Sequence, residues 1–245
     1  SLPQKLKTSF DPILGPVITQ SLAVNDRVAI ANQVRQVAFW IMAAQTGLAL
    51  MGSIPAEAVM GVVGPQFVAG SAALGFLLFA EVLASTGAVC ESALVYTARH
   101  RNLVISIAML GVQIALSFAL IVGMRRLGWP ETWQAAGPAV ALMIGVGLTS
   151  VIKARLLGHI LAAPVSPWRW SLAAAAVAAI VVGGAFTMLP HHFEWLELVG
   201  GEPAIAATYL FVLWKWAFGP ADRALFGKMP KADEATLPNV GSPVR

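Results

Sequence analysis

The stretch LVISIAMLGVQIALSFALIVGM, residues 103–124, decides the fold of this chain. It contains no Asp, Glu, Lys or Arg. An α-helix rises 1.5 Å per residue, so a helix over this stretch is about 33 Å long. The hydrocarbon core of a bilayer is about 30 Å thick. The stretch is therefore predicted to cross a membrane as a helix.

The rest of the chain is also rich in hydrophobic residues and poor in charged ones. Of its 245 residues, 58% are hydrophobic and only 11% are charged, and the mean hydropathy is +0.74. An average soluble domain has about 25% charged residues. The composition predicts an all-α, polytopic integral membrane helix bundle with about six transmembrane helices. The expected spans are residues 37–54, 67–96, 103–124, 134–152, 170–189 and 204–218.

The two ends of the chain are more polar than the predicted bundle, which covers residues 37–219. Within residues 1–36, the part from Asp11 to Arg35 places apolar side chains at approximately helical spacing among polar ones. This pattern predicts an amphipathic cytoplasmic helix that leads into the first span. Residues 220–245 are rich in Pro, Lys, Asp and Glu, which predicts a disordered cytoplasmic tail.

The positions of Lys and Arg predict the orientation in the membrane. The amino-terminal segment, every second loop and the tail hold 14 of these residues, and the loops on the other side hold 2. Cytoplasmic loops carry the excess of positive charge in membrane proteins. Both termini are therefore expected in the cytoplasm.

Several classes of function receive no support from the sequence. The net charge of +4 comes from residues in the predicted cytoplasmic loops, so a nucleic-acid partner is not expected. The adjacent His191 and His192 lack further residues at metal-ligand spacing, and no catalytic triad or phosphate-binding glycine loop is present. We expect no metal, no cofactor and no enzymatic activity.

Three polar side chains inside the predicted spans are candidates for a functional role. Glu81 lies near the middle of its span, where a carboxylate costs on the order of 3 kcal/mol on insertion scales. It is a candidate for proton coupling or substrate contact, and the alternative is a neutral Glu that hydrogen-bonds a neighbouring helix. Glu91 is a second candidate, with an ion pair to Arg99 or another loop cation as the alternative. Gln113 would bind either a sugar hydroxyl or an adjacent helix.

Cations and small residues give two further predictions. Arg99, Arg101, Lys153 and Arg155 either attract a phosphate or pyrophosphate head group or only determine topology. Lys153 and Arg155 are expected to close the fourth span. Small residues also recur every fourth position in that span, which predicts close approach of another helix. They are Gly137, Ala141, Gly145 and Thr149.

Three short motifs resemble those of one transporter family. FDPIL at residues 10–14 is similar to a Phe-x-Pro-Ile segment, and VGPQFVAGSAAL at 63–74 is similar to a Phe-Gly-x-x-Phe turn. Gly128 with AAGPA at 135–139 is similar to a Gly-x-x-Gly-Ala-Ala turn. In this order they resemble the carboxy-terminal half of polysaccharide flippases, the Wzx-like exporters of the MATE-like multidrug, oligosaccharidyl-lipid and polysaccharide superfamily.

The resemblance implies a lipid-linked oligosaccharide flippase with two helical lobes around a polar cavity. The substrate would be a polyprenyl-pyrophosphate-linked oligosaccharide, moved by alternating access, with membrane lipid around the protein. This chain would then be part of a longer protein, and the missing amino-terminal lobe would supply the other wall of the cavity. Two alternatives stay open: a small-molecule or drug exporter of the same fold, and a membrane-embedded enzyme or scaffold of envelope assembly.

Overall fold

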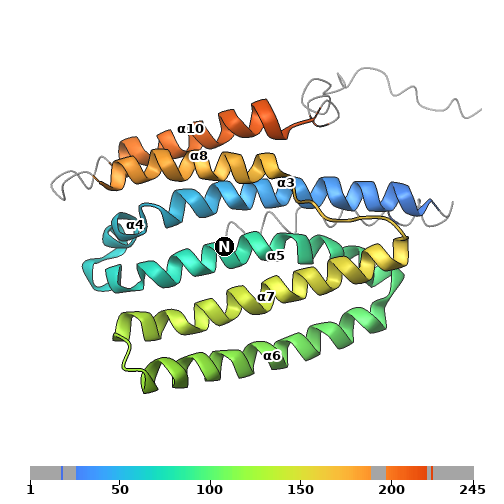
Figure 1. Ribbon diagram of the computed structural model, residues 1–245, viewed down its shortest axis with the longest axis horizontal. Helices are drawn as coiled ribbons and strands as arrows, with labels where there is room; N and C mark the ends of the chain where they lie inside the picture. Colours follow the sequence, from blue (N-terminus) through green and yellow to red (C-terminus); the bar gives the residue numbers. More distant parts are fainter. Residues whose placement is uncertain (1–17, 19–25, 189–196, 220–221, 223–245) are drawn as a thin grey trace, which may run out of the picture.

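The computed structural model describes residue 18, residues 26–188, residues 197–219 and residue 222, and these residues contain helices and no strand. Figure 1 shows the long helices lying side by side in the order α10, α8, α3, α5, α7 and α6. Apart from Asp222 and Ile18, the predicted cytoplasmic tail and the first part of the predicted amphipathic helix lie outside the described residues. The all-α helix bundle predicted from composition is confirmed.

The first described helix, α3 (Arg27–Ser53), runs without interruption through the predicted start of the first span at residue 37. The Asp26 side chain accepts a hydrogen bond from the Ala29 N–H at 2.9 Å and so caps the helix. After Ser53 the chain bends by 72° into the short helix α4 (Ala56–Val63). The sequence predicted only a turn here. Pro55 ends α3, but the segment that follows is rich in residues that favour helices.

Three long helices follow in antiparallel order. A 3-10 turn (Pro65–Gly70) leads into α5 (Ser71–Thr97), and the single non-helical residue Ala98 separates α5 from α6 (Arg99–Arg126). Gly128, with a φ of 68°, turns the chain into α7 (Glu131–Leu161). The prediction that Lys153 and Arg155 close the fourth span is wrong for the helix, which continues to Leu161.

The last helices are shorter. They are α8 (Trp170–Thr187) and α10 (Glu202–Val212), and π-helical turns flank α10 at Glu197–Gly201 and Leu213–Ala217. In the described part of the chain, four helices, α5 to α8, are long and apolar enough to cross a membrane, and the bent pair α3 and α4 makes a fifth if it counts as one span. The chain is therefore a membrane-embedded helical protein.

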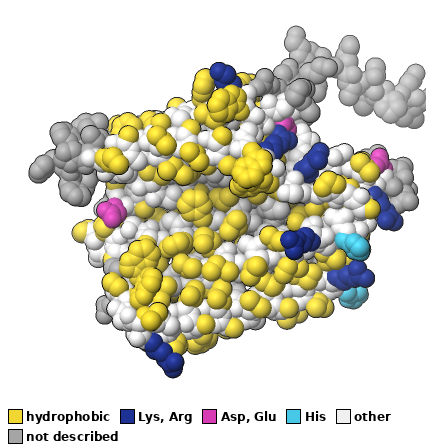
Figure 2. Space-filling model, in the orientation of Figure 1, with side chains coloured by type: hydrophobic (Ala, Val, Ile, Leu, Met, Phe, Trp, Pro, Cys, Tyr) yellow, Lys and Arg dark blue, Asp and Glu magenta, His cyan; other side chains and the backbone are white. Residues whose placement is uncertain are grey.

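Helix α3 lies between two apolar clusters. One side of its first half packs on α5 and α7 through buried residues that include Val34, Val89 and Leu157. Its other side packs on α8 and α10 around Phe39, whose side chain is fully buried, and Tyr209. Helix α6 is at the edge of the row and exposes most of its side chains. Figure 2 shows hydrophobic side chains over the middle of one face and most Lys and Arg toward one end.

Candidate functional site

A polar groove of about 320 Å³ lies among α5, α6 and α7. Each helix contributes four lining residues at positions i, i+3, i+4 and i+7, the spacing that places side chains on one face of a helix. The lining residues are Ala84, Gly87, Ala88 and Glu91 from α5, Ser106, Met109, Leu110 and Gln113 from α6, and Val146, Thr149, Ser150 and Lys153 from α7.

An ion pair lies in this groove. The Lys153 Nζ donates to the Glu91 Oε2 at a distance of 2.8 Å. The Lys153 side chain is only 4% exposed, whereas the Glu91 side chain is 49% exposed. Lys153 is buried because α7 continues for two further turns beyond it and packs against α5 there. An ammonium group in such a place requires a counter-charge, and Glu91 supplies it from the open side of the groove.

Glycines allow the three helices to come close enough to form the groove. A Cβ added to Gly87 would lie 2.5 Å from the Ser150 Oγ and 3.2 Å from the Ser150 Cα. A Cβ added to Gly145 would lie 3.3 Å from the Gln113 Cβ. The prediction that the small-residue strip of α7 receives another helix is confirmed, and that helix is α6.

The hydroxyl groups that line the groove differ in their hydrogen-bond partners. The Ser150 Oγ donates to the Leu83 carbonyl of α5 at 2.7 Å, and the Thr149 Oγ1 donates to the Gly145 carbonyl of its own helix at 2.7 Å. The buried Ser106 Oγ has no hydrogen-bond partner in the described part of the chain, and the same holds for the Asn102 Oδ1 one turn away on α6. Buried polar atoms are rarely left without partners, so these two atoms of α6 are exceptions that a bound water or ligand group would satisfy.

Three of the seven predicted site residues therefore meet in one place: Glu91, Gln113 and Lys153 line the groove. Glu81 is half-buried on α5 but is not among the lining residues, and ten residues of helix, about 15 Å, separate it from Glu91. The cation that pairs with Glu91 is Lys153 of α7.

The other predicted cations lie apart from the groove. Arg99 and Arg101 are exposed in the first turn of α6. Arg155 is exposed on α7 and lines a separate, apolar cavity of about 580 Å³ that opens beside Pro164 and Trp168. His191 and His192 lie outside the described residues, among which no group of three or more His, Cys, Asp or Glu side chains is placed to hold a metal ion.

A second polar centre, which the sequence did not indicate, lies at the end of the bundle where α8 begins. The Asp222 carboxylate, buried to all but 4%, accepts hydrogen bonds from the Arg169 Nη1 at 2.8 Å, the Gly219 N–H at 3.0 Å, and Gln36 and Trp40 at 3.2 Å. The Arg169 guanidinium also lies 3.8 Å from the centre of the Phe39 ring. This cluster joins α3, the start of α8 and the end of the last helix.

The ionised form of Asp222 is the stable one in this cluster. Burial on its own raises the pKa of Asp222, but the hydrogen bonds from Arg169, the Gly219 N–H and Trp40, with the charge of Arg169, outweigh burial and hold the pKa below its usual value. The cluster contains no apparent space for a ligand, because each carboxylate oxygen already accepts two hydrogen bonds. Its role is to hold helices together.

No family model, no curated protein and no solved structure matches this chain. The resemblance to polysaccharide flippases stays a prediction that rests on the sequence motifs.

Proposed function

We propose that this chain is a transporter component that resembles the flippases of polyprenyl-pyrophosphate-linked oligosaccharides in the bacterial inner membrane. One observation supports the proposal above the others, namely the groove that combines the Glu91–Lys153 pair with Gln113 and Ser106 among three apolar helices. Charged and amide groups are costly inside a bilayer, and where they occur they line substrate or ion pathways.

The chemistry of the groove suits the barrier that such a transporter lowers. A polyprenyl tail crosses hydrocarbon at little cost, whereas sugars and pyrophosphate lose their hydration and need hydrogen-bond partners. Lys153 would attract the pyrophosphate, while Gln113 and Ser106 would bind sugar hydroxyls. The exposed face of α6, which includes Leu103, Ile107 and Phe118, would remain in contact with lipid.

The open side of the groove requires a cover, because Glu91 is half-exposed there. In this proposal a second helical lobe closes that side, and movement of the lobes exposes the groove to either side of the membrane. Glu81, further along α5, would lie on the same wall. The proposal includes six spans with both termini in the cytoplasm, and Arg99, Arg101 and Arg155 would then attract the pyrophosphate at the cytoplasmic surface.

The test is a flipping assay in inverted membrane vesicles from cells that produce the complete protein. A fluorescent polyprenyl-pyrophosphate oligosaccharide is added outside the vesicles, and its protection from a membrane-impermeant quencher measures transport. We expect Lys153→Gln to reduce transport at least tenfold, because it removes the charge that attracts pyrophosphate. Arg126→Gln, which changes an exposed cation at the end of α6 and outside the groove, is the matched control and should retain most of the activity.

Other outcomes would overturn the proposal. If Lys153→Gln transports the lipid-linked oligosaccharide as well as the unchanged protein does, the groove is not the path. If the vesicles accumulate an organic cation such as ethidium and leave the lipid-linked sugar unmoved, the protein is a small-molecule exporter.

A further inference from the structure

A larger cavity, of about 1130 Å³, lies at the end of the bundle where α3 bends into α4. The 72° bend directs α4 across this end, and the 3-10 turn that follows α4 returns the chain to α5. Trp133 of α7, Thr187 at the end of α8 and Leu198 complete the wall. This cavity shares no lining residue with the polar groove, so it is a separate site.

The side chains that line this cavity have one sign of charge. Glu57, an exposed residue in the first turn of α4, is the charged residue among them, and no Lys, Arg or His lines the cavity. No described cation forms an ion pair with Glu57. Among the residues that the structure describes, this cavity therefore holds a negative charge without a counter-charge.

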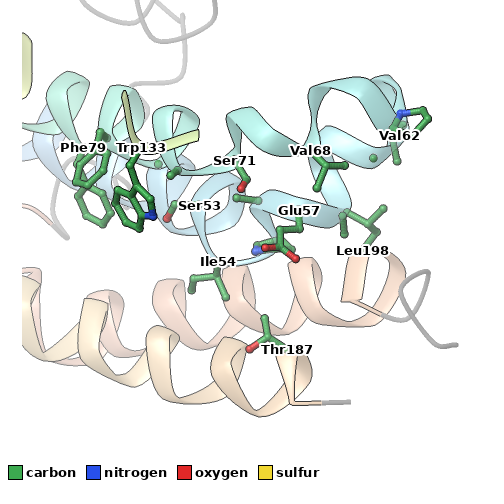
Figure 3. A pocket seen from close by; sticks show the side chains of 18 residues that line it. Ser53, Ile54, Glu57, Val62, Val68, Ser71, Phe79, Trp133, Thr187 and Leu198 are labelled. Atoms are coloured by element: carbon green, nitrogen blue, oxygen red, sulfur yellow. The ribbon is translucent and has the colours of Figure 1, made fainter. Parts of the chain in front are cut away.

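Aromatic rings stand at one end of the same cavity. Figure 3 shows Phe79 and Trp133 at one end, Glu57 further along, and the hydroxyls of Ser53 and Ser71 between them. Phe79 is 38% exposed and Trp133 is 44% exposed, so both rings offer surface to a ligand. Aromatic faces attract organic cations, and they also cover apolar ligand surface.

We infer that this cavity binds an amphiphilic organic cation, with the positive group near Glu57 and the apolar body on Phe79 and Trp133. The volume of about 1130 Å³ is slightly above the range of small-molecule sites, which is about 300–1,000 Å³, so an organic cation of drug size fits. An anion is disfavoured because it would meet Glu57 and no cation. The proposal does not rest on the flippase function, since it concerns binding at a different site from the groove.

The experiment is titration calorimetry on the purified protein in neutral maltoside micelles, with protein-free micelles as the blank. The probes are tetraphenylphosphonium and tetraphenylborate, which have nearly the same size and shape but opposite charge. We expect the protein to bind tetraphenylphosphonium at least tenfold more tightly than tetraphenylborate. Glu57→Gln should remove this preference, and Trp133→Ala should weaken tetraphenylphosphonium binding about fivefold or more.

Glu202→Gln is the matched control, because Glu202 is also in the first turn of a helix but does not line the cavity. It should bind both probes as the unchanged protein does. Glu57 is exposed, so its substitution is not expected to prevent folding, and a monodisperse elution profile checks this. Equal affinity for the two probes, or an unchanged preference in Glu57→Gln, would overturn the proposal and leave the cavity as an apolar crevice.

Discussion

The helices on the two sides of α3 are similarly apolar, but they pack differently. On one side, α5, α6 and α7 enclose a polar groove at mid-length, with small residues where the helices approach. On the other side, α8 and α10 pack on α3 through large side chains, and Tyr209 donates a hydrogen bond to the Ala43 carbonyl at 2.6 Å. The charged contact of that side, Arg169 with Asp222, is at its end.

The difference shows how a membrane protein separates a site from its support. On the α5–α7 side, polar atoms such as the Ser106 Oγ have no hydrogen-bond partner among the described residues. On the α8–α10 side the Asp222 carboxylate has all its hydrogen bonds within the described chain. Substitutions on the α8–α10 side should therefore affect mainly stability, and substitutions in the groove should affect mainly transport.

The largest effect on stability is expected from Asp222→Ala. The substitution removes a buried carboxylate and leaves Arg169, Trp40 and Gln36 without their acceptor. Breaking a buried pair costs about 3 kcal/mol or somewhat more. The measurement is the midpoint of unfolding by sodium dodecyl sulfate in mixed micelles. A shift no larger than that of a surface substitution would show that the cluster does not hold α8 and the last helix to α3.

The ion pair in the groove should respond unequally to loss of its two partners. Glu91→Ala leaves the buried Lys153 ammonium without a counter-charge and should cost about 2 kcal/mol. Lys153→Met leaves a carboxylate that is already half-exposed, so the cost should be about 1 kcal/mol or less. The same unfolding measurement compares the two variants. Equal losses would mean that water reaches Lys153 as freely as Glu91.

A third test concerns the close approach of α5 and α7. Gly87→Ala places a Cβ against the Ser150 Cα and Oγ, and the overpacking should cost about 1 kcal/mol. Gly111→Ala on α6 is the control, because a Cβ there meets nothing within 4 Å. The control should be neutral or slightly more stable, since Ala favours a helix more than Gly does. If the two variants have the same stability, the close contact of α5 with α7 at Gly87 does not restrict the size of the residue there.

The smallest effect is a pH dependence of the Asp222 cluster. The folded state holds the pKa of Asp222 below the unfolded value, which is about 3.9. The carboxylate therefore contributes its full stability above the unfolded pKa and loses it as the pH falls through the lower, folded pKa. The contribution of Asp222 to the unfolding midpoint should be constant from pH 7 to about 5, and it should decrease below about pH 4. In Asp222→Asn, the part of the decrease in the unfolding midpoint that comes from this carboxylate should be absent.

Hydropathy and charge were enough to predict the bundle, because the cost of burying charge in lipid acts on every span. The four-residue repeat on α7 also predicted the close approach of another helix, and the structure identifies that helix as α6. The partner of Glu91 was not predicted, since Lys153 is 62 residues away and hydropathy does not determine which helices are neighbours. Lys153 was expected to end its span, because charges mark span ends, but burial and ion pairing let α7 continue.

The Asp222 cluster was beyond prediction for a similar reason. Its residues come from three segments that are distant in the sequence. In the sequence alone, each residue is explained equally well as an ordinary surface residue. Asp222 belongs to a segment whose composition indicated disorder, and Arg169 was counted as a loop cation. The roles of Asp222 and Arg169 depend on contacts between the ends of helices that are distant in the sequence.

The lengths of the helices have a consequence for the surrounding bilayer. Helix α8 has 18 residues and is about 27 Å long, whereas α7 has 31 residues and is about 46 Å long. A hydrocarbon core of about 30 Å matches α8 when it is upright, but α7 must tilt or extend into the head-group region. A change of lipid chain length thus acts unequally across the bundle. A thicker bilayer would favour a more upright α7, while α8 would require local thinning at its own edge.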